Sequence, residues 1–333
     1  LRTCRQLTDI PSATMEQIVI KRYDHTQAAR WNDFCRTARN ATFLFNRGFM
    51  DYHADRFTDF SLMALSGSGR IIALLPADIR GTTLRSHGGL TYGGWIIPAR
   101  HFNGSTMLRL WESSLEMMRA SGIEELRYKP LPWIYADRPS EDDRYALFRF
   151  GAKLEESLLS STIDMRSPGP FNESTRQSLK LAASAGVTVA EAGISGLPEF
   201  WRMLERCLAE RHDGVRPVHT LAEMTMLMER FPAEIRLFAA YGRGGEMMAG
   251  TLLFDTPRVA HTQYIATTPE GRAVKAFPPI VRCLLDGPMR SRAYFDFGTS
   301  CLDGGRYLNE GLLLQKSGMG AGATVYETYS LKL

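Results

Sequence analysis

One order of secondary-structure elements occurs twice along the 333 residues, and this repeat constrains the fold more than any other feature. Each copy has three apolar runs separated by short turn segments, which predicts three meandering strands. An apolar helix and one more short strand follow in each copy. The N-terminal copy is predicted at strands 60–65, 71–76 and 83–87, helix 105–119 and strand 126–129. The C-terminal copy is predicted at strands 235–241, 247–254 and 259–266, helix 278–285 and strand 294–297.

Hairpins followed by a strand–helix–strand crossover give a mixed sheet with helices on its faces. The sequence therefore predicts an α/β protein, of the α+β mixed-sheet kind, with two lobes at 15–165 and 166–333. A duplication explains the repeat, although hairpins and crossovers are common enough for the order to recur by coincidence in a large α/β protein. Residues 1–14 are irregular and are treated as a leader of uncertain origin, outside the fold prediction.

The segment between the two copies is predicted to be helical, because apolar side chains recur there at helical spacing. Thr220 and Glu223 have the form of a capping box that starts one of these helices. Met224, Met226 and Met228 in the same helix are interpreted as core-filling side chains. The predicted helices cover 140–150, 173–185, 197–208 and the residues from 221 onward, and helix 308–316 and strand 324–331 end the chain.

Charge and cysteine content narrow the classes of function. The net charge of +4 suits an anionic partner but is too small to indicate nucleic-acid binding by itself. The five cysteines are dispersed, which indicates reduced thiols and a cytoplasmic protein. No apolar run approaches the roughly 18 residues of a membrane helix, so membrane insertion is not expected. His212 and His219 match no zinc-binding spacing, and no metal site is predicted.

Several stretches, taken in order, resemble the Fem-type (FemAB-like) aminoacyl- and acyltransferases of the GNAT superfamily. No single stretch is as specific as the phosphate loop of an NTPase, and the ordered set carries the resemblance. It implies two tandem GNAT-like lobes with a cleft between them, and N-acyl transfer onto an amine in that cleft. The stretches are 31–34 and 42–53, a basic helix and strand at 176–182 and 186–189, and a C-terminal signature at 294–298, 304–311 and 315–320.

The resemblance also implies the partners. The donor would be acyl-CoA or aminoacyl-tRNA as a co-substrate, with no tightly bound cofactor. The acceptor would be the amine of a small molecule or of a peptidoglycan precursor. Because the chain has no heptad run for a coiled-coil arm, any tRNA contact is expected only at the acceptor end. The alternative is a non-catalytic ligand-binding protein on a degenerate pair of GNAT lobes.

Lys316, His261 and Asp296 are the predicted catalytic residues. Lys316 matches the lysine of an aromatic–Lys pair that, in the Fem-type pattern, steadies charge at the reacting carbonyl; here Gln315 replaces the aromatic residue. Lys316 is alternatively a solvated lysine at a helix C-terminus. His261 suits a general base, because histidine titrates near neutral pH, or is a structural histidine. Asp296 would orient a substrate amine or cap the loop that follows it.

Eight residues form the predicted substrate-binding set. Two of them flank a loop with four glycines at 88–94, which either lets backbone approach a ligand or serves turns. The cationic members would hold an acidic acceptor or are solvated surface charges. Strand alternation places Gln263 on the same face as His261. The set comprises Arg47, His87, Tyr92, Lys129, Arg176, Gln263, Tyr264 and Asn309.

The segment 270–279 corresponds to the loop that holds the CoA pyrophosphate in GNAT enzymes through backbone N–H groups. Gly271 is its one glycine, and Pro278 and Pro279, which have no N–H, stand where the helix should begin. Arg272 and Lys275 supply charge instead, and Gly271, Arg272 and Lys275 are the predicted cofactor-binding residues. The loss of donors favours an aminoacyl-tRNA or an unusual acyl donor over acetyl-CoA.

Overall fold

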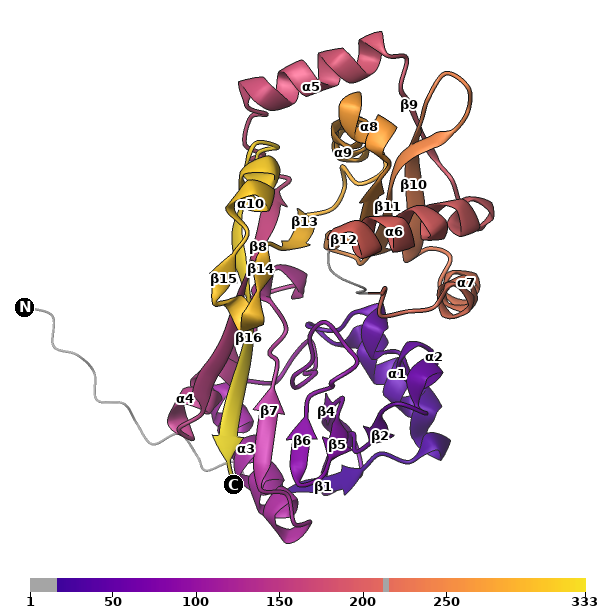
Figure 1. Cartoon of the computed structure of the whole chain (residues 1–333). Coiled ribbons are helices and arrows are strands. Elements are labelled where there is room, and N and C mark those ends of the chain that lie inside the picture. The colour runs from indigo at the N-terminus through magenta and orange to yellow at the C-terminus, as the bar shows by residue number, and fades with distance from the viewer. Residues whose placement is uncertain (1–16, 212–215) are drawn as a thin grey trace, which may run out of the picture.

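The two halves of the chain repeat one topology in the computed structural model, which describes residues 17–211 and 216–333 (Figure 1). The predicted leader therefore lies outside the described residues, as does His212. The strands of the N-terminal half are β1 (Ile18–Arg22), β2 (Thr58–Asp59), β3 (Leu62–Ser66), β4 (Ile71–Leu75), β5 (Asp78–Arg80), β6 (Thr83–Arg85), β7 (Glu125–Tyr128) and β8 (Lys153–Asp164). Its helices are α1 (Ala28–Thr37), α2 (Arg47–Met50), α3 (Gly104–Ala120) and α4 (Asp142–Arg149).

The C-terminal half follows the same order with longer strands. Its strands are β9 (Thr188–Glu191), β10 (Ile235–Tyr241), β11 (Met247–Asp255), β12 (Val259–Thr267), β13 (Tyr294–Thr299), β14 (Cys301–Leu302), β15 (Tyr307–Leu308) and β16 (Gly322–Lys332). Its helices are α5 (Glu173–Ser184), α6 (Leu197–Arg211), α7 (Leu221–Arg230), α8 (Pro269–Ala273), α9 (Phe277–Asp286) and α10 (Glu310–Ser317).

Each half contains a three-strand meander, a helix and a parallel strand, as predicted. β10, β11 and β12 pair antiparallel in turn, and β13 returns parallel to β12 after α9. In the N-terminal half the first two strands form one bent hairpin, β2–β3 against β4–β5, and β7 runs parallel to β6 after α3. The bend falls at Ser61 and Pro76, where Ala77 instead donates its N–H to the Ser61 hydroxyl. The strand that pairs with β6 is therefore β5, and the sequence did not predict β5 as a strand.

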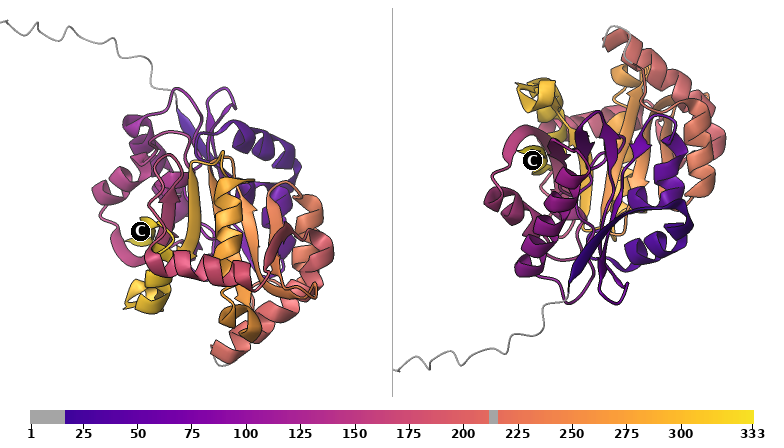
Figure 2. Two further views of the ribbon diagram at one scale, coloured as in Figure 1. Left: turned by 90° about the horizontal axis from the view of Figure 1, so that it is seen from above. Right: turned by 90° about the horizontal axis from the view of Figure 1, so that it is seen from below.

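The two halves exchange their last strands, and this joins them into one sheet. β8, from the N-terminal half, pairs with β13, whereas β16, from the C-terminal half, pairs with β7. β8 and β16 also pair with each other along most of their length. The resulting 11-stranded sheet of the described chain has the order β2-β5-β6-β7-β16-β8-β13-β12-β11-β10-β9. Seen from above and below, helices lie on both sides of these strands (Figure 2).

Aromatic side chains from both halves meet in a shared core. Phe43 and Phe49 contact Phe231 and Phe254, with ring centroids 5.3 to 5.9 Å apart. Burial of four aromatic rings at one boundary contributes several kcal/mol, so the halves are held together by packing as well as by strand exchange. Met224 and Met228 belong to this core, as predicted for α7.

Local sequence signals explain where the helices begin. The Thr220–Glu223 capping box is formed at the start of α7, as predicted. Asn172 and Asn309 accept from the first-turn N–H groups of α5 and α10. β8 was not predicted, because its first residues are exposed and its last are buried, so neither an alternating nor a continuous apolar pattern marks it.

Candidate active site

A cleft of about 920 Å³ opens where β12 and β13 diverge. The two strands pair only from Val259 to His261, although both run further. Beyond His261 the gap is walled by α5, α6, α8, α9 and α10, and α10 stands on the opposite side of β13 from α8 and α9 (Figure 1). Thr91 and Leu158 are the cleft-lining residues from the N-terminal half, so most of the cleft belongs to the C-terminal lobe.

His261 and Asp296 form a hydrogen-bonded pair at the closed end of this fork. The imidazole Nδ1 lies 2.8 Å from Asp296 Oδ2, and the carboxylate is fully buried. Burial alone would raise the pKa of Asp296, but the adjacent His261 and the hydroxyls of Ser160 and Thr162 together lower it. The carboxylate is therefore ionised and accepts the Nδ1 proton, so that Nε2 is the acceptor atom when the imidazole is neutral.

Hydroxyl groups saturate the Asp296 carboxylate. Ser160 Oγ and Thr162 Oγ1 on β8 donate to Oδ1 at 2.6 and 2.7 Å. Tyr326 on β16 donates to Oδ2 at 2.8 Å, and its oxygen lies 2.8 Å from the hydroxyl of Tyr135. Burial raises the pKa of Tyr326 well above its ordinary value, so this hydroxyl stays protonated and remains a donor. The two exchanged strands thus hold the partner of His261.

Lys316 lies beside this pair, on the last turn of α10. Its ammonium donates to the carbonyl oxygens of Gly298 and Thr299, both at 2.8 Å. Burial lowers the pKa of Lys316 to about 8, although the charge of Asp296 counteracts part of this effect. Gly298 has a φ of 73°, and a Cβ there would lie 3.3 Å from the His261 ring. Lys316 therefore fixes a turn that packs directly against the imidazole.

A bulge in β12 places Gln263 in the cleft. Leu253 pairs with Thr262 and Leu252 with Tyr264, so Gln263 is the extra residue and regular alternation is interrupted. His261 and Gln263 both line the cleft. The hydroxyl of Tyr264 instead forms a hydrogen bond with His219 Nδ1 at 2.6 Å, and Tyr264 is not among the lining residues.

The predicted cofactor residues Gly271, Arg272 and Lys275 all line the cleft. Their backbone N–H groups, however, are engaged within the protein: Gly271 donates to Thr268 Oγ1, and Lys275 to the carbonyl of Arg272. Arg272 also donates from its guanidinium to the carbonyl of Thr267, while Lys275 is exposed. The observed α9 begins with Phe277, Pro278 and Pro279, so this helix start presents few N–H donors for a pyrophosphate.

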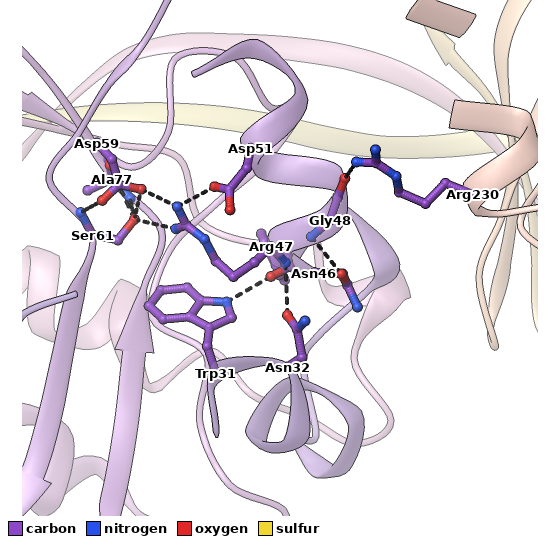
Figure 3. A network of polar contacts seen from close by, with 11 residues as sticks. Trp31, Asn32, Asn46, Arg47, Gly48, Asp51, Asp59, Ser61, Ala77 and Arg230 are labelled. Carbon is purple, nitrogen blue, oxygen red and sulfur yellow. Dashed lines mark hydrogen bonds and ion pairs between the residues drawn. The ribbon is translucent and has the colours of Figure 1, made fainter. Parts of the chain in front are cut away.

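Arg47 lies in the N-terminal lobe, away from the cleft, in a buried ion-pair network (Figure 3). Its guanidinium contacts the carboxylates of Asp51 and Asp59, the latter at 2.6 Å. It also lies 3.9 Å from the ring centroid of Tyr23. Arg47 does not line the cleft, and its guanidinium is already paired with two carboxylates of the protein. The structure therefore does not place Arg47 where it could hold an acidic acceptor.

The glycine loop of the N-terminal lobe is filled by protein. A Cβ at Gly93 would lie 1.6 Å from the Ser86 carbonyl oxygen, and one at Gly89 would meet the ring of His53. His87 stacks on His53 with centroids 5.3 Å apart, and burial lowers the pKa of His87 to about 3. These glycines therefore permit close internal packing, the second of the two alternatives raised by the sequence.

The other four predicted binding residues also have internal partners. Tyr92 donates to Thr42 Oγ1, and Lys129 Nζ donates to the Leu90 carbonyl at 2.9 Å. Arg176 is exposed and paired with Glu173, and Asn309 caps α10. The structure thus brings together Lys316, His261, Asp296, Gln263 and the predicted cofactor residues, and does not bring the rest of the set to the cleft.

Four residues of the site were not predicted: Tyr135, Ser160, Thr162 and Tyr326. Ser160 and Thr162 lie on the unpredicted strand β8, and Tyr135 and Tyr326 meet only through the exchange of strands. Hydroxyl side chains carry no sequence pattern of their own. Knowledge that β8 pairs with β13 would have been needed to predict Ser160 and Thr162 as partners of Asp296.

The comparisons with known proteins concern one domain and the overall fold. Residues 171–303 match the family model of the acetyltransferase (GNAT) domain. The fold is similar to the crystal structure of FemX, with a TM-score of 0.67 and 13% identity over 94% of this chain and 97% of that chain. No curated protein matches the sequence.

Two further structures share the fold. One is the C-terminal domain of a putative lysylphosphatidylglycerol synthetase from Agrobacterium fabrum, with a TM-score of 0.57 and 14% identity over 92% of each chain. The other is a tandem GNAT protein from the clavulanic acid biosynthesis pathway, with a TM-score of 0.51 and 12% identity over 95% of this chain and 98% of that chain.

Residues 171–303 therefore correspond to an acetyltransferase (GNAT) domain, and the chain as a whole has the fold of tandem GNAT proteins. The two-lobed fold is similar to that of FemX and of the tandem GNAT protein, which is the fold that the sequence resemblance had implied. No helix within 17–211 or 216–333 is long and apolar enough to cross a membrane. Across the same residues, no group of three or more His, Cys, Asp or Glu side chains is placed to hold a metal ion.

Proposed function

We propose that the cleft transfers an acyl or aminoacyl group from an activated donor to an amine, with His261 as the general base. The observation that supports this most directly is the convergence of His261, its buried partner Asp296 and the cationic Lys316 at one end of a large cleft. Amide formation requires a general base for the amine proton, which a carboxylate can orient. It also requires a donor or cation near the reacting carbonyl to stabilise the oxyanion.

In the proposed reaction the acceptor nitrogen attacks the carbonyl carbon of the donor, and the new C–N bond forms. The nitrogen loses its proton to His261 Nε2, and the imidazolium is stabilised by the ionised Asp296. The bond to the leaving sulfur or oxygen then breaks, and the leaving group takes up the proton. No metal or redox step is part of this scheme.

Lys316 would stabilise the oxyanion in this scheme. An ammonium has three N–H donors, and two of them hold the carbonyls of Gly298 and Thr299. The third is free for the developing negative charge. With a pKa of about 8, the lysine is mostly protonated at neutral pH.

Further features bear on the choice of donor and on the compartment. Internal use of the N–H groups at 271–276 and the two prolines at the start of α9 weigh against a donor that depends on pyrophosphate binding. They favour an aminoacyl-tRNA or an unusual acyl donor over acetyl-CoA. Acyl-CoA and aminoacyl-tRNA are both tested as donors, with a small-molecule or peptidoglycan-precursor amine as acceptor. Cys35, Cys207, Cys283 and Cys301 carry free thiols, in keeping with a cytoplasmic enzyme.

The experiment offers both donors to the purified chain. Acetyl-CoA binding is measured by calorimetry, charged and uncharged tRNA by filter retention at low and moderate salt, and transfer with a panel of amines. Lys316→Ala is expected to lower the transfer rate about a hundredfold with the fold intact. Lys21→Ala, an exposed lysine on β1, is the matched control and should leave the rate unchanged. Absence of transfer from every donor would overturn the proposal.

A further inference from the structure

Apolar side chains are exposed on one segment beside the cleft. Leu302 and Tyr307 are directly paired in the β14–β15 hairpin and are 50% and 58% exposed. α10 follows this hairpin immediately, and its Leu314 is 70% exposed. Leu308 and Leu312 are also exposed. These five residues are called the α10 apolar surface.

This surface is costly for a protein to keep unless it has an apolar partner. Leu312, Leu313 and Leu314 follow one another on a helix of eight residues, so leucine side chains point in several directions around it. Each leucine left in water forfeits stabilisation that burial would give. Exposed apolar side chains that gather beside a cleft are typical of a binding surface.

The surface is continuous with the cleft. Leu312 and Leu314 line the cleft as well as being exposed. Leu312 precedes Lys316 by four residues, so the two side chains share one face of α10, about one turn apart. Leu312 therefore places an apolar side chain of the cleft wall one helical turn from Lys316.

The charge of the cleft selects among acyl groups. Its lining residues within the described structure include Arg272, Lys275 and Lys316 but no Asp or Glu. The one carboxylate near the reacting end, Asp296, is fully buried behind His261. An aminoacyl group would bring a cationic α-amine with no free carboxylate to receive it, whereas an aliphatic chain needs only apolar contact.

We infer that the cleft takes the aliphatic chain of a medium- or long-chain acyl thioester. This inference rests on the proposed function and names the class of its acyl group. The carbonyl lies beside Lys316 and His261, and the chain lies against Leu312 and Leu314. The C–S bond breaks as the amide C–N bond forms, and the thiol leaves with the proton that His261 took from the amine.

The test measures binding of acyl thioesters to the intact chain without turnover. N-acetylcysteamine thioesters with acetyl, butyryl, octanoyl and lauroyl chains compete with a fluorescent fatty acid, and glycyl thioester is included as the aminoacyl probe. Affinity is expected to rise about two- to fourfold for each added methylene, because a fully buried methylene corresponds to about a fourfold gain. Leu312→Gln and Leu314→Gln should each weaken lauroyl binding about tenfold and leave acetyl binding unchanged.

Phe148→Gln is the matched control, since Phe148 is 78% exposed on α4 and does not line the cleft. Its chain-length series should equal that of the unaltered protein. Affinity independent of chain length, tighter binding of the glycyl than of the butyryl thioester, or equal effects of Leu314→Gln and Phe148→Gln would each overturn the inference. So would Leu314-dependent sedimentation with phospholipid vesicles in the absence of any chain-length effect, because the surface would then dock on a membrane. Transfer assays report on the proposed function separately.

Discussion

The hydroxyl of Tyr326 connects Asp296 to Tyr135, so its removal affects two hydrogen bonds. It donates to Asp296 Oδ2 at 2.8 Å and lies 2.8 Å from the hydroxyl of Tyr135. Tyr326→Phe removes a hydrogen bond to a charged group, about 2 kcal/mol, and leaves the buried Tyr135 hydroxyl without its partner, about 1 kcal/mol more. We therefore expect a loss of about 3 kcal/mol in the free energy of unfolding.

Tyr135→Phe should be much milder. Tyr326 keeps its bond to Asp296, so the loss is that of one neutral hydrogen bond, about 1 kcal/mol. The double variant has no orphaned hydroxyl and should lose only the bond to Asp296, about 2 kcal/mol. The double loss is thus smaller than the sum of the single losses by about 2 kcal/mol, a coupling that a double-mutant cycle measures.

Equilibrium urea unfolding of the four proteins, followed by tryptophan fluorescence and circular dichroism, gives these values. Coincident transitions by the two probes are expected, because the exchanged strands tie both lobes into one sheet. Additive losses, or a Tyr326→Phe loss below that of Tyr135→Phe, would show that the hydroxyl chain from Tyr135 to Asp296 does not exist in solution.

Three other perturbations test separate features. Because the pKa of Lys316 is lowered to about 8, the transfer rate should fall as pH rises through about 8, and a flat alkaline rate profile would exclude its charge from catalysis. Its ordinary pKa is 10.5, so the unfolded chain binds more protons between about pH 8 and 10.5; stability should rise with pH in that window, and Lys316→Met should abolish the rise in urea titrations. Arg47→Met should cost about 2 kcal/mol of unfolding free energy, because it removes the charge-assisted hydrogen bonds of a buried guanidinium to Asp51 and Asp59. Arg36→Met, which breaks an exposed pair with Asp33, should cost under about 1 kcal/mol, and equal costs would contradict the buried network. Gly93→Ala should lower the melting temperature strongly, since its Cβ would overlap the Ser86 carbonyl, and an unchanged melting curve would refute that packing.

The order of the helices and strands could be predicted from the sequence, because local sequence patterns determine it. The apolar runs of β10, β11 and β12, which turn residues separate, and the capping box of α7 needed no knowledge of distant residues. The pairing of β8 with β13 was not accessible, since it joins segments more than a hundred residues apart and β8 has no clear period.

The candidate site divides in the same way. Lys316, His261 and Asp296 came from motif and strand position, and they converge. Arg47 was misplaced because burial of a charge depends on its partners, and the contact with Asp59 forms only when α2 packs on the β2–β3 bend. Tyr326 and Tyr135 could not be paired without the fold.

The exchanged strands also bear on how such a chain can be divided. A cut between β8 and α5 would leave each fragment with the edge strand that completes the other fragment's sheet, so neither fragment would be a finished unit by itself. The two pieces should instead recombine as a reciprocal pair. Two unlinked copies of one lobe that traded their last strands would have the same connectivity, which makes a strand-swapped homodimer the simplest precursor from which fusion of two genes produces this architecture.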